Sequence, residues 1–300
     1  MTVVQLPTRF TIGGSEAAAA AGIDPHRSRV GLWLEKTGRV PREETEAMRW
    51  GTLLQPIILA ELCERGYRAT PFGHELRDED HQWLAGHPDG FVYEGEDEDE
   101  DGVVLEVKTV GQWAKREWNG QPPLAYVAQC QHYIHLTGAD CALLAVLVGG
   151  QRLELTEIER NDQWIATLIE LEQEFLERYL IPDEPPPVRH DDADNLARMF
   201  PEHEPGRTVR LGKDALDVLA ELRTRTAQRD AIERQCETLR NQLKATMGDA
   251  ETALDARGDE VIHWRTVTTE RVDVKRLRAE RPDIAAEFVK PIQSRRFQPV

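Results

Sequence analysis

Apolar residues recur along the first 180 positions with two periods, one typical of helices and one typical of strands. The helical period predicts helices over residues 15–21, 29–37, 42–65, 123–136 and 162–180. Alternation with period two predicts strands over residues 103–109 and 153–158. A buried strand is predicted over the apolar run 141–148, and a further strand over 86–93. Ser15 is expected to cap the first helix. Pro56 is expected to kink or divide the third, because it cannot donate a hydrogen bond to the carbonyl of Thr52. Such a succession of helices and strands indicates an α/β (α+β) fold.

The pattern changes after residue 182. Proline and acidic residues predict a linker over residues 183–207, between a first domain of residues 1–182 and a C-terminal region of residues 208–300. In that region we expect one long helical stretch over 212–247, either as a hairpin or packed on a partner. Shorter elements are expected as a strand over 261–267, a helix over 274–278 and a strand near 294–297.

The composition of the chain limits the classes of protein to which it can belong. The chain has 300 residues, of which 40% are hydrophobic and 30% charged, as in globular proteins. It contains no apolar run of membrane-spanning length and no secretory h-region. The four cysteines, at positions 63, 130, 141 and 236, form no CxxC pair. We therefore expect a reducing, cytoplasmic setting and no zinc site.

The net charge of −17 argues against an open basic face for nucleic acid. Much of the excess is local, because seven acids lie within residues 94–101. Such a run is typical of a solvated loop rather than a metal site. A DNA-binding surface would have to be a focused basic patch, which fits an enclosed channel.

The candidate chemistry lies in Asp89, Glu106 and Lys108, which two neighbouring strands would bring together. Glu106 and Lys108 point to the same face of an otherwise apolar strand, where charged groups are costly to bury without partners. Two carboxylates and an ammonium suit metal-assisted phosphodiester hydrolysis. Spacing alone leaves surface charges on a hairpin as an equally good interpretation.

The flanking motifs extend this triplet into a resemblance. The chain resembles the lambda-exonuclease-like, YqaJ-type viral recombinases of the PD-(D/E)xK nuclease superfamily. The matching stretches are IGGSEAAAAAG (12–22), LWLEKTG (32–38), RWGTLLQP (49–56), GHPDGF (86–91), LEVK (105–108) and YVAQCQHY (126–133). They follow the order of the family and cover roughly residues 9–180.

The resemblance implies a core of a mixed β-sheet flanked by helices, followed here by a helical and small β C-terminal region. It also implies a divalent-metal site for Mg²⁺ or Mn²⁺. Asp89, Glu106 and the backbone carbonyl of Val107 would be the metal ligands. Lys108 would orient or help deprotonate the attacking water, and Gln129 would lie near the nucleophile or the scissile phosphate.

The resemblance also suggests groups that bind DNA. Ser15 matches the serine of the family's glycine turn, where a helix N-terminus and a hydroxyl suit a terminal 5′-phosphate. Family members carry an arginine just before this turn, and Arg9 stands one place closer to Ser15 than in that pattern. Arg27, Arg29 and Tyr126 are further candidates for contact with DNA.

One position departs from the family. Its usual glutamate in the WG-containing helix is Gln55 in this chain. An amide oxygen can contact a cation but supplies no charge. Gln55 is therefore a doubtful metal ligand, and the choice between one and two metals stays open.

The function implied is a metal-dependent 5′-to-3′ exonuclease that acts on linear double-stranded DNA ends for phage-type homologous recombination. Its partners would be a single-strand annealing protein and further copies of itself in a ring, in the bacterial cytoplasm, with a phage or prophage gene. The alternatives are a catalytically weakened DNA-end-binding or assembly protein, supported by Gln55, and an endonuclease of the same superfamily. Residues 208–300 could dock the annealing protein, mediate self-assembly or guide DNA.

Overall fold

The computed structural model describes residues 7–41, 44–93, 102–116, 118–290 and 294–299. The chain divides into two compact units, residues 1–200 and residues 201–300. The acidic run 94–101, which we expected to be a solvated loop, lies outside the described residues. Among the described residues, no helix combines the length and the apolar character that crossing a bilayer requires.

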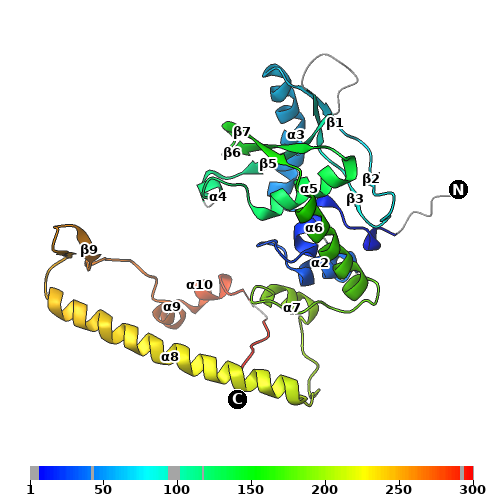
Figure 1. Cartoon of the computed structure of the whole chain (residues 1–300). Coiled ribbons are helices and arrows are strands. Elements are labelled where there is room, and N and C mark those ends of the chain that lie inside the picture. The colour runs from blue at the N-terminus through cyan, green and yellow to red at the C-terminus, as the bar shows by residue number, and fades with distance from the viewer. Residues whose placement is uncertain (1–6, 42–43, 94–101, 117, 291–293, 300) are drawn as a thin grey trace. The chain divides into compact units, whose positions relative to one another are not determined.

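The first unit is built on a five-stranded sheet with the strand order β1-β4-β5-β6-β7 (Figure 1). The strands are β1 (Arg68–Pro71), β4 (Gly90–Tyr93), β5 (Val103–Val110), β6 (Cys141–Val148) and β7 (Arg152–Glu159). The β5 and β6 strands are parallel and the other neighbouring pairs are antiparallel. The mixed sheet that we predicted is therefore confirmed.

Helices cover both faces of this sheet. The helices of this unit are α1 (Gly14–Ala20), α2 (Arg29–Lys36), α3 (Glu46–Glu64), α4 (Gln112–Arg116), α5 (Leu124–Thr137), α6 (Asp162–Phe175) and α7 (Ala193–Met199). Short 3-10 and π turns at Thr8–Phe10 and Leu176–Leu180 and a two-stranded sheet of β2 (Leu76–Arg77) and β3 (Ala85–Gly86) complete the unit. Ile58 and Leu62 of α3 pack on one face of the large sheet. Cys130 and Ile134 of α5 pack on the opposite face. The sheet is thus the middle layer between α3 and α5.

The core also contains a buried ion pair. His132 of α5 donates from Nδ1 to the Glu172 carboxylate at 3.0 Å and from Nε2 to the Ala85 carbonyl at 2.9 Å. The side chains of His132 and Glu172 are 1% and 0% exposed. Because both ring nitrogens face acceptors, the imidazole is held in its protonated form.

Three details of the first unit differ from our predictions. Gly13, not Ser15, is the N-cap of α1, so Ser15 lies in the first turn. The third helix begins at Glu46, where the Thr45 hydroxyl accepts from the Met48 amide at 3.2 Å, and it runs through Pro56 without dividing. The strand predicted over 86–93 is two strands, since residues 87–89 lie between β3 and β4 and interrupt the ladder.

The predicted linker over residues 183–207 spans the division between the units. Its first part, up to Phe200, belongs to the first unit. Asp192 is fully buried and accepts hydrogen bonds from the Ser28 hydroxyl and from Asn195 Nδ2, the latter at 2.9 Å. These contacts attach the segment after α6 to the start of α2.

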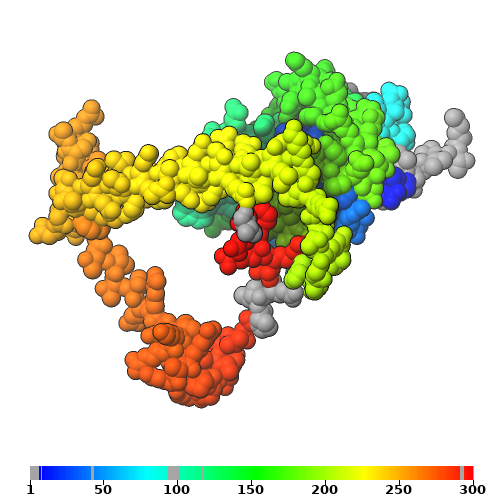
Figure 2. Space-filling view, turned by 90° about the horizontal axis from the view of Figure 1, so that it is seen from below, coloured from blue at the N-terminus to red at the C-terminus, as the bar shows by residue number. Residues whose placement is uncertain are grey.

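The second unit is dominated by α8 (Lys213–Met247), a single helix in which the hairpin alternative does not occur. It ends at Gly248, whose φ of 59° lies in the region that favours glycine. The remaining elements are β8 (Thr252–Leu254), β9 (Glu260–His263), α9 (Val274–Glu280) and α10 (Pro282–Glu287). In Figure 2, α8 in yellow is one continuous rod with the β8–β9 hairpin in orange at its end. The predicted strand near 294–297 is wrong, because residues 294–299 have no regular structure.

Candidate active site

The pairing of β4 with β5 brings the first two charged residues of the triplet together. Gly90 lies opposite Leu105, so Asp89, one residue before β4, lies beside the middle of β5. The Val107 amide donates a hydrogen bond of 2.8 Å to Asp89 Oδ2. The proximity that we expected from the two strands is confirmed.

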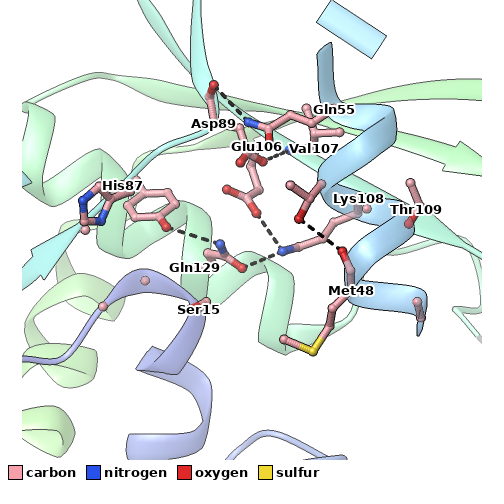
Figure 3. A pocket seen from close by; sticks show the side chains of 17 residues that line it. Ser15, Met48, Gln55, His87, Asp89, Glu106, Val107, Lys108, Thr109 and Gln129 are labelled. Carbon is pink, nitrogen blue, oxygen red and sulfur yellow. Dashed lines mark hydrogen bonds and ion pairs between the residues drawn. The ribbon is translucent and has the colours of Figure 1, made fainter. Parts of the chain in front are cut away.

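Glu106 and Lys108 point from β5 toward α5. Lys108 Nζ lies 2.7 Å from Glu106 Oε1 and donates to Gln129 Oε1 at 2.8 Å (Figure 3). Leu105 and Val107, on the opposite face of β5, pack in the cluster that contains α3. The alternation of faces along this strand is therefore as predicted, with the charged pair partnered rather than exposed.

These groups line a pocket of about 560 Å³. It is bounded by the start of α1, by α3, by the segment before β4, by β5 and by α5. Ser15, Gln55 and Gln129 line it together with the triplet. Gln55 Nε2 lies 3.4 Å from the backbone carbonyl of Asp89, so the departure from the family stands at the pocket itself. His87 also lines the pocket, on the side away from Lys108 (Figure 3).

The three arginines predicted to contact DNA do not line this pocket. The Arg9 guanidinium lies over the Phe10 ring at 4.3 Å and faces a separate small cavity. Arg27 forms an ion pair with Glu35. Arg29 donates to the Ala20 carbonyl at 2.7 Å and lies 3.4 Å from Glu174.

Tyr126 lies close to the site without lining the pocket. Lys108 Nζ is 5.3 Å from the centre of its ring, a cation–π contact. Whether Tyr126 or any of the three arginines contacts DNA stays a prediction.

Burial sets the ionisation of the triplet. It raises the pKa of Glu106 to about 7, although the nearby Lys108 opposes the shift. Burial likewise raises the pKa of Asp89. Burial alone would lower the pKa of Lys108, but the negative charges of Glu106 and Asp89 outweigh it and raise that pKa. The site therefore concentrates negative charge around one protonated lysine.

The residues present fit a hard divalent cation. Glu106 Oε2 is buried and has no hydrogen-bond partner among the described residues. A buried carboxylate oxygen in that state is costly unless a cation or a donor meets it. Asp89, Glu106, the Val107 carbonyl and the Gln55 amide could supply oxygen ligands to Mg²⁺ or Mn²⁺. Within the described ranges, no three His, Cys, Asp or Glu side chains form a metal-binding group, so two carboxylates are the charged part of this set.

Tyr133 is a site residue whose contacts the sequence did not reveal. Its hydroxyl lies 3.4 Å from Gln129 Nε2, and its ring lies against Gly14 and Gly86. A Cβ atom at either glycine would lie 2.5 Å from Tyr133 Cε1. The glycines in the GGS and AGH stretches signal a close approach, but nothing in their spacing names Tyr133 as the neighbour.

Glu16 and Lys36 hold the turn in front of α1. Glu16 Oε2 accepts from the Gly13 amide at 3.1 Å and lies 2.5 Å from Lys36 Nζ. Lys36 Nζ also donates to the Thr11 carbonyl at 2.7 Å. The two side chains thereby fix the wall of the pocket that carries Ser15.

Two comparisons with known sequences find similar proteins. Residues 8–140 match the profile of the YqaJ-like viral recombinase domain. The uncharacterized protein YqaJ of Bacillus subtilis (strain 168) is 29% identical over 297 residues, which cover 96% of this chain and 91% of that protein.

Solved structures of low sequence identity match part of this chain. The alkaline exonuclease LHK-Exo of Laribacter hongkongensis is 23% identical with a TM-score of 0.48, covering 59% of this chain and 90% of that one. A putative exonuclease from Eubacterium rectale is 13% identical with a TM-score of 0.43, covering 72% and 95%. The profile match and the similarity to YqaJ support the resemblance that the sequence motifs show. Residues 8–140 of this chain are thus similar in sequence to the YqaJ-like viral recombinase domain.

Proposed function

We propose that this chain is a metal-dependent deoxyribonuclease that degrades the 5′-ended strand of linear double-stranded DNA in the 5′-to-3′ direction. The observation that carries the proposal is the convergence of Asp89, Glu106 and Lys108 on one pocket of a YqaJ-like recombinase domain. Two carboxylates that share a buried site with a lysine match the needs of phosphodiester hydrolysis. The enzyme is accordingly a hydrolase.

The proposed mechanism divides its tasks among these residues. Asp89, Glu106 and the Val107 carbonyl would hold Mg²⁺ or Mn²⁺, which would polarise the phosphate ester and offset its charge. Lys108 orients the water that attacks in line with the leaving oxygen, and its ammonium stabilises the negative charge that develops on the phosphate. Gln129 accepts from the Lys108 ammonium at 2.8 Å and so fixes its position.

Action at an end, rather than within a strand, is supported by the start of α1. Ser15 is exposed and lines the same pocket as Lys108. Its hydroxyl can donate to a terminal 5′-phosphate that enters the pocket beside the scissile bond. Arg27 and Arg29 form ion pairs with Glu35 and Glu174, and their contact with DNA remains a prediction.

The biological setting follows from the family. A recombinase domain of viral type implies phage-type homologous recombination, in which the 3′ overhang is passed to a single-strand annealing protein in the bacterial cytoplasm. A homo-oligomeric ring would enclose duplex DNA and so reconcile a chain of net charge −17 with a polyanionic substrate.

The experiment is release of nucleotides from a 5′-phosphorylated linear duplex, with Mg²⁺ and with Mn²⁺. Lys108→Ala is expected to lower the rate by about a hundredfold or more, because it removes the charge beside the reacting phosphate. Lys244→Ala is the matched control, since this lysine lies on α8, 3.7 Å from Glu237. No release by the wild type with either ion would reject the proposal.

Gln55 supports a second candidate function, that of a weakened nuclease that binds or assembles on DNA ends. Its neutral amide stands beside Asp89, where a glutamate would add charge. If Gln55 limits metal binding, Gln55→Glu should raise the rate of release. Cleavage of covalently closed circles would instead identify an endonuclease.

A further inference from the structure

The segment that follows β5 carries aromatic and basic side chains that do not line the pocket. Trp113 and Arg116 belong to α4, and Trp118 follows that helix. Trp113 is 76% exposed, the largest exposed fraction of any tryptophan among the described residues. An indole this open to water can present its flat aromatic face to a ligand.

Arg116 places a positive charge against the indole of Trp113, and we call these two side chains the platform. The centre of its guanidinium lies 4.5 Å from the centre of the Trp113 ring, so a cation backs one face of the indole. The exposed fraction of Trp113 leaves the other face open to solvent. Arg116 is itself exposed and forms no ion pair with any residue that the structure describes. Its charge is therefore available to a phosphate.

A series of ring contacts joins this segment to the reactive centre. Lys115 Nζ lies 4.0 Å from the centre of a Trp118 ring, and Trp118 meets Tyr126 edge-on with ring centres 5.5 Å apart. Tyr126 in turn lies 5.3 Å from Lys108 Nζ. Lys115 is also fixed by Glu154 of β7 at 2.9 Å. The platform is therefore anchored to the same packed group as the lysine of the active site.

We propose that Trp113 and Arg116 form a binding site for single-stranded DNA, in which a base stacks on the open face of Trp113 and Arg116 pairs with a neighbouring phosphate. Aromatic rings interleaved with basic side chains bind single strands in this way without regard to sequence. The inference rests on the proposed function, which removes one strand of a duplex and leaves the other unpaired. The site would hold that unpaired strand beside the pocket in which its complement is cut.

The test compares binding of two labelled oligonucleotides of about twelve positions, one of thymidine and one of abasic deoxyribose phosphate, by fluorescence anisotropy. The full chain is used in EDTA, so that no hydrolysis occurs. We expect the wild type to bind oligothymidine about tenfold more tightly than the abasic strand. Trp113→Leu, which keeps apolar bulk but no aromatic face, should abolish this preference, whereas Trp113→Phe should keep most of it.

Two further variants define the contact. Arg116→Gln should weaken binding of both oligonucleotides equally and reduce its salt dependence, because it removes a phosphate contact. Trp264→Leu, which changes a tryptophan that is 45% exposed in the second unit, should bind both as the wild type does.

Equal binding of the two oligonucleotides by the wild type, or an undiminished preference in Trp113→Leu, would overturn the inference. If Trp113→Leu keeps the preference for oligothymidine but changes the mass of the assembly in light scattering, Trp113 makes a contact with protein instead. Because binding is measured without metal, absence of nucleotide release by the wild type would reject the nuclease proposal alone. Normal release without any Trp113-dependent base preference would reject the platform alone.

Discussion

The two units of the chain differ in how far their apolar residues are buried. In the first unit Ile58 and Leu62 of α3 and Cys130 and Ile134 of α5 are buried against the two faces of one sheet, and Leu144 of that sheet is 0% exposed. In the second unit none of the described residues is buried, and Leu239 of α8 is 59% exposed. Stability in the first unit comes from packing, whereas α8 depends on contacts within its own helix. Substitutions of the same kind should therefore have unequal effects in the two units.

Charge divides the units as well. The acidic excess of the chain lies in residues 1–200, whereas acidic and basic residues nearly balance after residue 200. The unit that holds the pocket is thus the one whose overall field repels DNA. Under the proposed function, DNA binding there would depend on local cations and on a divalent metal rather than on net charge.

The largest expected effect concerns a carboxylate in each unit. Under the proposed function, Glu106→Gln should lower nucleotide release by about a thousandfold, because it would remove one of the two proposed charged metal ligands. Glu233→Gln, on the exposed surface of α8, should leave the rate unchanged. A Glu106→Gln enzyme within tenfold of the wild type would show that the pocket is not the reactive centre.

The next effect concerns ion pairs. Glu172→Gln should lower the free energy of unfolding by about 4 kcal/mol, because the protonated His132 then loses its buried counter-charge. Glu237→Gln breaks only exposed pairs on α8 and should leave the unfolding midpoint unchanged. Urea unfolding followed by circular dichroism measures both. Equal effects of the two substitutions would contradict the contrast between the units.

Truncation of a leucine sharpens the same contrast. Leu144→Ala should cost about 3 kcal/mol of unfolding free energy, since it opens a cavity between β6 and α5. Leu239→Ala should change it by less than about 0.5 kcal/mol. A large loss for Leu239→Ala in dilute solution would mean that α8 is packed on another surface.

The smallest effect is a dependence on pH. Burial would lower the pKa of His132, but Glu172 outweighs it and raises that pKa above the unfolded value of about 6.5. The stability that His132 contributes is therefore complete below about pH 6.5 and is lost as the pH rises through the folded value. The raised pKa of Glu106 acts in the same direction, with a loss as the pH rises through about 7.

The urea midpoint in EDTA should consequently fall from pH 6 toward pH 9. The fall should be smaller in Glu172→Gln, where only the part due to Glu106 remains. His263→Gln, which alters an exposed histidine of the second unit, should follow the wild type. A urea midpoint that rises over this pH range would mean that the titration of other groups outweighs that of His132 and Glu106.

Much of the first unit could be predicted because its elements are encoded locally. The period-two pattern of β5 and the apolar run of β6 are local properties of their sequences, and these strands appear where we expected them. The interruption at residues 87–89 and the absence of a strand at 294–297 depend on which neighbour is available for pairing, and one segment does not encode its neighbour.

The site shows the same limit. Asp89, Glu106, Lys108 and Gln129 could be placed together because a shared strand face and a family pattern both point to them. Ion pairs of Arg27 and Arg29 with Glu35 and Glu174 could not be predicted, and these pairs explain why the arginines lie outside the pocket. Arg29 and Glu174 lie 145 positions apart, and such a pair becomes visible only after the helices are packed.

The ring of Tyr133 between Gly14 and Gly86 has a consequence for how relatives of this protein can diverge. Any side chain at either glycine would overlap the ring, and the ring cannot withdraw without releasing Gln129. The three positions should therefore change together: a relative with alanine at the position of Gly14 or Gly86 should carry a residue smaller than tyrosine at the third. A set of sequences in which these positions vary independently would show that the slot is looser than its distances indicate.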